Sequence, residues 1–173
     1  MGFRDTKRGA SVPDLEGFNS APADRLRPLL TDCLAVPRWV DAVLADRPYP
    51  DVDALLAASA RHADLSDAEV HAAIAGHPRI GERATGDGVA AKWSADEQSG
   101  VTASLADRLL AANAAYEDRF GHIYLVCATG LSGEQVLADL TSRMGNPPDE
   151  ELRVVNRELA KIAALRLRKV LAA

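Results

Sequence analysis

The sequence has few aromatic residues, only two cysteines and no long apolar run. Aromatic residues make up 5% of its 173 residues, whereas 47% are hydrophobic and many of these are alanine. Sheets are usually built from β-branched and aromatic side chains, whereas small apolar side chains suit closely packed helices. The composition therefore predicts an all-α protein, and the length suits a single domain with a sizeable core.

The low number of cysteines and the excess of negative over positive charge limit the cellular compartment and the kinds of partner that we expect. Cys33 and Cys127 are far apart and lie among apolar residues, which is typical of buried thiols in a reducing compartment. The net charge of -5 argues against a nucleic-acid or anionic-membrane partner, because phosphate neutralisation needs a basic face. The start of the chain lacks an apolar core of signal-peptide length, and no later run approaches a membrane span. We expect a soluble cytoplasmic protein.

Apolar residues at spacings of three and four predict a single domain of seven to nine helices over residues 16–173, after a loose lead-in at 1–15. The predicted helices lie within residues 19–36, 37–48, 51–64, 65–76, 93–121, 132–146 and 149–173. Asn19 or Ser20 is the expected N-cap of the first, and Pro28 is expected to kink or split it. The run HIYLVCATG at 122–130 predicts one short strand or extended segment.

A helix is expected to stop directly before a histidine. Ser66 and Glu69 form a capping box at the start of this helix, and Gly76 ends it. Pro78 lacks an N–H and pushes His77 away from helical dihedrals, so the imidazole is expected on a fixed corner beside a glycine-rich loop. A catalytic role fits this corner, because loops place side chains against ligands. A simple cap on the helix C-terminus, where a cation is favoured, also fits.

A second motif, WSADEQ at 93–98, also allows two interpretations. Ser94 and Glu97 have the spacing of a capping box, which is a purely structural role. With Gln98, however, they place a hydroxyl, a carboxylate and a carboxamide in one helical turn that also offers unpaired backbone N–H groups. Such a turn is a natural cradle for an anionic or carbonyl-rich small molecule.

The histidines do not predict a metal site. His62, His71, His77 and His122 lack ligand spacings such as HExxH, and His71 is expected on a helix surface.

Seven motifs nonetheless occur in an order typical of one enzyme family. They are Phe18-Asn19, Trp39, Arg47-Pro48, GHPRIGE at 76–82, WSADEQ at 93–98, AAYEDRFGHIYLVCATG at 114–130 and ELAKIAALRL at 158–167. From about residue 15 to its end, the chain resembles the decarboxylases of 2-oxo-4-hydroxy-4-carboxy-5-ureidoimidazoline (OHCU), which act in urate degradation. The resemblance implies an all-helical enzyme, usually a homodimer, that uses no metal or organic cofactor and releases (S)-allantoin and carbon dioxide.

The resemblance also implies the site. His77 would be the catalytic acid and Glu97 the second catalytic group. The substrate-binding residues would be Pro78, Ser94, Ala95, Asp96, Gln98, His122, Ile123, Tyr124, Leu125, Val126 and Arg166. The chain departs from the family at FGHIY, where the family has FGFPF, and at HPRIG, where many members have HPDLA. The first departure changes side chains in a segment expected to contact the substrate through its backbone, and the second keeps the histidine and the proline.

A cation for the substrate carboxylate is expected on the last helix. Arginine suits this task because its fork can hold a carboxylate at two points. The resemblance indicates Arg166, with Arg143 as the weaker alternative. Arg166 is expected at the edge of a buried stripe that contains Ile162, Leu165 and Val170, and Arg168 is expected to point elsewhere.

Two other classes of function remain open on the residues alone. In a non-catalytic helical interaction module, His77 and Glu97 would serve only as caps. In a metal-dependent hydrolase of a related ureide, the same two residues would be ligands.

Overall fold

The computed structural model describes residues 14–81 and 103–172. Within these ranges the chain forms eight helices and no β-strand, which confirms the all-α prediction. The helices are α1 (Leu15–Ser20), α2 (Ala23–Cys33), α3 (Pro37–Ala45), α4 (Val52–His62), α5 (Asp67–Ile74), α7 (Ala103–Phe120), α8 (Gly133–Arg143) and α9 (Pro148–Ala172).

Several helix boundaries follow from local chemistry. Ser66 and Glu69 form the predicted capping box of α5, and Ser132 with Gln135 forms another at α8. Pro37 occupies the first turn of α3, where its missing N–H costs nothing. These ends are therefore determined by residues within one turn of each other.

The start of the chain differs from the prediction. Asn19 and Ser20 lie inside α1, and α2 begins only after Pro22. The cap prediction was wrong because Asn19 has a tertiary partner: its amide donates to the Tyr49 carbonyl at 2.9 Å and accepts from the Tyr49 N–H at 2.8 Å. Pro28 lies inside α2, which continues through it and is not split.

Two other predictions concern less regular parts of the chain. Residues 123–128 form an extended segment without strand pairing, which is one of the two forms expected for this run. α7 ends before Gly121, as predicted, and this glycine has a φ of 75°. The lead-in at 1–15 and the first part of the helix predicted over 93–121 lie mostly outside the described residues.

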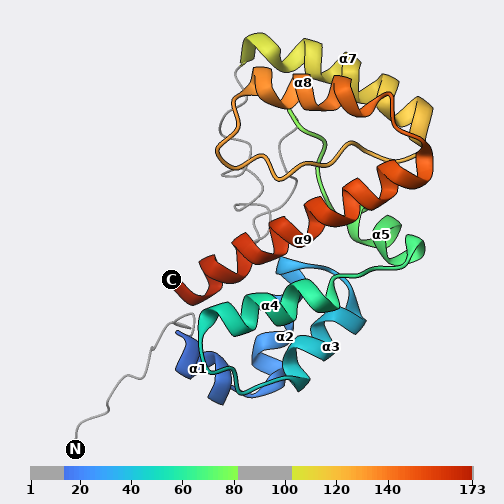
Figure 1. The fold of residues 1–173 in the computed structure, drawn as a ribbon. Coiled ribbons are helices and arrows are strands. Elements are labelled where there is room, and N and C mark those ends of the chain that lie inside the picture. Colours follow the sequence, from blue (N-terminus) through green and yellow to red (C-terminus); the bar gives the residue numbers. More distant parts are fainter. Residues whose placement is uncertain (1–13, 82–102, 173) are drawn as a thin grey trace, which may run out of the picture.

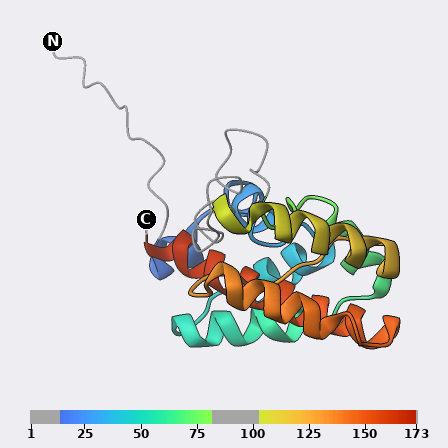
Figure 2. The same cartoon turned by 90° about the horizontal axis from the view of Figure 1, so that it is seen from above.

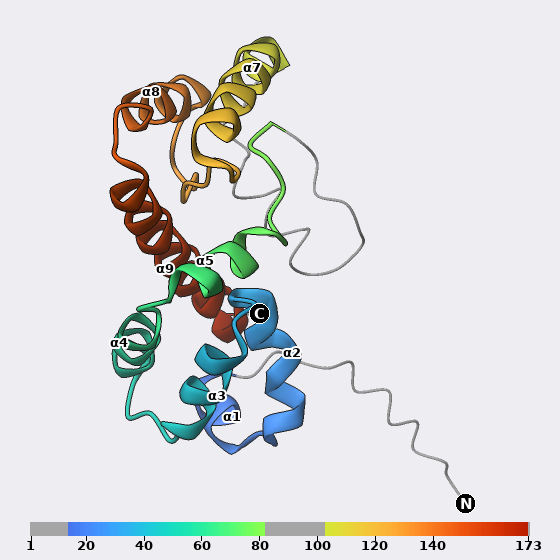
Figure 3. The same ribbon diagram turned by 90° about the vertical axis from the view of Figure 1, so that its right-hand side faces the viewer.

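The long helix α9 connects two hydrophobic cores. Figure 1 shows it running from the pair α7 and α8 to the group formed by α1 to α4. The first core includes Trp39 and Leu55 with the apolar face of α9, and α5 also packs on α9 between the two groups (Figure 3). The second core includes Leu109, Tyr116 and Tyr124, where α7 lies along α8 (Figure 2). Ile74 at the end of α5 therefore belongs to the first core, and Ile80, six residues later, belongs to the second.

Two remaining features concern thiols and membranes. Cys33 is buried as expected, whereas Cys127 is only half-buried. None of the helices in residues 14–81 and 103–172 combines the length and the apolar character that a membrane crossing requires.

Candidate functional site

His77 lies on the corner that the sequence predicted. α5 ends at Ile74, and the His77 N–H donates to the Ile74 carbonyl at 3.0 Å. Three residues later Ile80 is buried in the second core, where the Asn113 side chain donates to its carbonyl at 3.0 Å. The loop 75–81 is thus held at both ends, and His77 lies between the two attachments.

A pocket of about 380 Å³ opens beside this loop. Its lining residues are His71, Ile74, Ala75, His77, Arg79, Glu117, Gly121, His122 and Ile123. The structure therefore brings together three residues predicted for the site, His77, His122 and Ile123, although His122 lies 45 positions after His77 in the sequence. Pro78 is half-buried next to His77 and is absent from the pocket lining.

The environment of His77 strongly favours a neutral imidazole. Burial, and secondarily the positive charge of Arg166, lowers the pKa of His77 from 6.5 to about 4. Burial disfavours the charged form of a histidine, and a nearby cation adds to this effect. The charge of Arg166, 89 positions later in the sequence, thus acts on His77 in the folded chain.

Arg166 itself is held by the backbone of α2. Its side chain is buried within the packed face of α9, and its Nη1 donates to the Asp32 carbonyl at 2.9 Å. The prediction that Arg166 lies at the edge of the buried stripe was therefore wrong, because Leu165 is only half-buried whereas Leu167 is fully buried. Arg168 is exposed, as expected.

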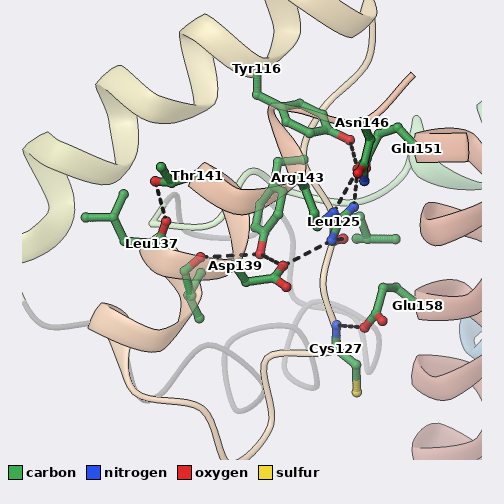
Figure 4. Close-up of polar contacts among 12 residues, drawn as sticks. Tyr116, Leu125, Cys127, Leu137, Asp139, Thr141, Arg143, Asn146, Glu151 and Glu158 are labelled. Atoms are coloured by element: carbon green, nitrogen blue, oxygen red, sulfur yellow. Dashed lines mark hydrogen bonds and ion pairs between the residues drawn. The ribbon is translucent and has the colours of Figure 1, made fainter. Parts of the chain in front are cut away.

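The alternative cation, Arg143, belongs to a buried network (Figure 4). Its guanidinium donates to Glu151 through Nε at 2.8 Å and through Nη2, and a second ion pair joins it to Asp139 at 3.3 Å. Glu151 is fully buried and also accepts hydrogen bonds from Tyr116 and Asn146. These contacts pair Arg143 with carboxylates of the protein itself.

The same network positions the extended segment after α7. Arg143 Nη1 donates to the Leu125 carbonyl at 2.8 Å, and the Cys127 N–H donates to Glu158 at 2.9 Å (Figure 4). The side chains of Tyr124, Leu125 and Val126 are buried in the cores. Of the five residues predicted at 122–126, only His122 and Ile123 therefore line the pocket, and the Leu125 carbonyl already has a partner.

His122 has a defined orientation in the pocket wall. Its Nδ1 lies 3.0 Å from the Ile123 carbonyl. Since a carbonyl oxygen can only accept, Nδ1 is the donor of this hydrogen bond. The ring also contacts Tyr116 and His71 edge to face, with both centroid distances at 5.6 Å.

Six residues of the pocket lining were not among the predicted site residues, and three of these have charged or titratable side chains: His71, Arg79 and Glu117. His71 is exposed on α5, as expected, but it also lines the pocket. Arg79 forms a two-point ion pair with Glu117, with Nε–Oε1 at 2.5 Å and Nη2–Oε2 at 2.9 Å. The sequence carried only a weak signal for this pair, namely that Arg79 lies two residues after the predicted catalytic histidine.

The second predicted motif lies outside the described residues. This applies to the catalytic candidate Glu97 and to the substrate-binding candidates Ser94, Ala95, Asp96 and Gln98. Within residues 14–81 and 103–172, no group of three or more histidine, cysteine, aspartate or glutamate side chains is arranged to hold a metal ion.

Comparisons of the sequence with known proteins consistently identify one family. A family model described as OHCU decarboxylase matches residues 19–168. The 2-oxo-4-hydroxy-4-carboxy-5-ureidoimidazoline decarboxylase of Amia calva is 30% identical over 136 residues, which are 75% of this chain and 78% of that protein. The uric acid degradation bifunctional protein TTL of Arabidopsis thaliana is 33% identical over 104 residues, which are 57% of this chain and 32% of that protein.

Solved structures show the same fold. A crystal structure of OHCU decarboxylase in the presence of (S)-allantoin has a TM-score of 0.70 and 19% identity, and the match covers 88% of this chain and 100% of that one. A structure of (S)-allantoin synthase has a TM-score of 0.67 and 19% identity, with 91% of this chain and 54% of that one covered. At this identity the structural likeness supports the fold alone.

Proposed function

The chain belongs to the OHCU decarboxylase family, and we propose that it removes carbon dioxide from 2-oxo-4-hydroxy-4-carboxy-5-ureidoimidazoline and forms (S)-allantoin in urate degradation. The family match over residues 19–168 and the Amia calva relative support this activity. Within the structure, the observation that supports it best is the position of His77. It lies on a held corner at a pocket, beside the buried cation Arg166.

The chemistry requires little beyond orientation and one proton. When the bond to the carboxylate carbon breaks, carbon dioxide leaves and its bonding electron pair passes into the neighbouring C=N unit of the ring. A proton then has to reach one face of the ring carbon so that a single enantiomer forms. The protein must therefore bind the carboxylate in a fixed orientation and deliver that proton from one side.

We assign carboxylate binding to Arg166. Its guanidinium is buried and one nitrogen is anchored on the Asp32 carbonyl, so binding does not have to order this side chain. The fork can hold a carboxylate at two points, and burial strengthens such contacts. The family resemblance supports the same residue.

We assign proton delivery to His77, with Glu97 as the second catalytic group. In the absence of substrate the imidazole is neutral, because burial and Arg166 both lower its pKa. A substrate carboxylate bound at Arg166 offsets the charge of that cation and removes the second of these causes. Substrate binding therefore raises the pKa of His77 and favours uptake of the proton that the imidazole then donates.

The decisive experiment follows the optical activity of the product. Freshly generated substrate decays spontaneously to racemic allantoin, so circular dichroism distinguishes enzymatic from spontaneous turnover. The wild-type chain should produce (S)-allantoin faster than the spontaneous reaction, and His77→Asn should abolish this signal while its melting temperature stays close to that of the wild type. A folded His77→Asn variant that still produces (S)-allantoin would show that His77 is only a helix cap.

A homodimer and a cytoplasmic location complete the proposal. The resemblance supports the dimer, and the composition of the chain supports the compartment. Sedimentation velocity of the purified chain should give a mass of two chains, and cell fractionation should recover the chain with cytoplasmic markers.

A further inference from the structure

One face of α7 contacts the loop that carries His77. Asn113 and Glu117 are four residues apart on this helix, so their side chains project from the same face. Asn113 donates to the Ile80 carbonyl at 3.0 Å, and Glu117 accepts from Arg79 at 2.5 and 2.9 Å. The loop 75–81 is thus tied to α7 through two of the residues that follow His77.

We propose that Arg79, Asn113 and Glu117 are positioning residues that hold the imidazole of His77 at the pocket wall. We call these three residues the loop anchor. The inference rests on the catalytic role proposed for His77 and adds the part of the chain that keeps this histidine in place. The loop anchor acts through the backbone of residues 75–81, and its members need not touch the substrate.

The chemistry of Asn113 supports a positioning role. The residue is 1% exposed, and it lies in a stripe of α7 that also contains the buried side chains of Leu109 and Tyr116. Among the described residues its Oδ1 accepts no hydrogen bond, so the Ile80 carbonyl is the partner that justifies a buried amide at this position. A leucine of similar size would suit the apolar surroundings better if the loop did not require the bond.

The chemistry of the ion pair supports the same role in a different way. Both side chains line the pocket, and both are partly exposed, with 42% for Arg79 and 26% for Glu117. Partly exposed pairs contribute little to global stability. Their two-point geometry instead restricts the direction of the Arg79 side chain, two residues from His77, so the pair can be broken without unfolding the protein.

The test measures the pKa of His77 by NMR titration of histidine-labelled protein without substrate. The variants are Arg79→Gln and Glu117→Gln. If the loop anchor holds the imidazole in its buried position, either substitution hydrates the ring, and the pKa of His77 rises toward 6.5 in both variants. If the two residues act on His77 only through their charges, loss of the cation raises this pKa and loss of the anion lowers it.

A matched control lies on the same helix. Arg108 of α7 pairs with Glu134 of α8 at 3.1 Å, and both side chains are more than half exposed. Arg108→Gln and Glu134→Gln break an ion pair that joins α7 to α8 and not to the loop. They should leave both the pKa of His77 and turnover unchanged.

Turnover supplies the second readout. We expect kcat to fall about tenfold or more in Arg79→Gln and Glu117→Gln with a smaller change in KM, since small misplacements of a catalytic group are costly. The charge-swapped double variant, Arg79→Glu with Glu117→Arg, should recover most of the lost kcat, which a glutamate in direct contact with substrate would not allow. Asn113→Leu should also lower kcat while the chain remains folded.

The outcomes separate this inference from the proposed function. Opposite shifts of the His77 pKa in the two single variants, or no shift in either, would overturn the positioning role whatever the activity of the enzyme. Upward shifts without any loss of kcat would overturn it as well. The catalytic role of His77 is instead refuted by an active His77→Asn variant, which leaves the loop anchor intact.

Discussion

The role of Arg166 in carboxylate binding can be tested by removing its two-point guanidinium fork and its positive charge in separate variants. Arg166→Lys keeps the charge and removes the fork, whereas Arg166→Met removes both. Arg168→Lys is the matched control, because this arginine lies two residues further along α9 and is exposed. The three variants therefore distinguish a bound carboxylate from a general requirement for charge on this helix.

The structure sets the expected magnitude. In the wild type Arg166 is buried and its Nη1 is anchored on the Asp32 carbonyl, which fixes the guanidinium that is proposed to hold the carboxylate at two points. A lysine at this buried position has a single ammonium, which loses at least one charge-assisted hydrogen bond. Such a bond contributes about 1.5–3 kcal/mol, so KM should rise about 10- to 150-fold in Arg166→Lys. Arg168→Lys should leave KM unchanged.

A second measurement needs no substrate. Because the positive charge of Arg166 lowers the pKa of His77, Arg166→Met should raise this pKa, whereas Arg166→Lys should leave it low. The value in Arg166→Met should still lie below 6.5, since burial is the larger cause of the shift. NMR titration of the His77 ring measures this directly.

Two results would refute the reasoning about Arg166. Equal KM values for Arg166→Lys and Arg168→Lys would remove Arg166 from the carboxylate site. An unchanged pKa of His77 in a folded Arg166→Met variant would contradict the electrostatic link between the two side chains.

Three further predictions concern other parts of the chain. Glu97→Gln should reduce turnover far more than the melting temperature, because glutamine can still close a capping box; equal melting losses in Glu97→Gln and Glu97→Ala with turnover kept in both would favour a structural role. The free energy of unfolding should decrease as the pH falls from about 6.5 to about 4, because the unfolded chain binds a proton at His77 that the folded chain excludes; urea unfolding at several pH values should show a weaker dependence in His77→Asn. Arg143→Met should destabilise the fold by about 3–5 kcal/mol, since it leaves the buried carboxylate of Glu151 without its cation; a loss below about 1 kcal/mol in chemical denaturation would contradict this account.

Much of the helical architecture follows from local sequence. The capping box of Ser66 and Glu69 and the proline at position 37 mark helix starts correctly because the groups that satisfy each other lie within one turn. The same local chemistry predicted that the chain leaves α5 before His77, since Pro78 cannot continue a helix. The error at Asn19 shows the limit of this reasoning: its side chain is a good cap, but Tyr49, 30 residues later, holds it.

The sequence by itself therefore determined the all-helical class, most helix ends, the corner at His77 and the family. Only the tertiary structure shows that the charge of Arg166 acts on His77 and that Arg143 is paired with the buried carboxylate of Glu151. Arg143 forms ion pairs with Glu151 and Asp139, whereas Arg166 donates a hydrogen bond to a backbone carbonyl of α2. The tertiary structure likewise brought Glu117 to Arg79 from 38 positions away. Periodicity and capping depend on neighbours within a turn, but the partner of a charged side chain depends on the path of the whole chain.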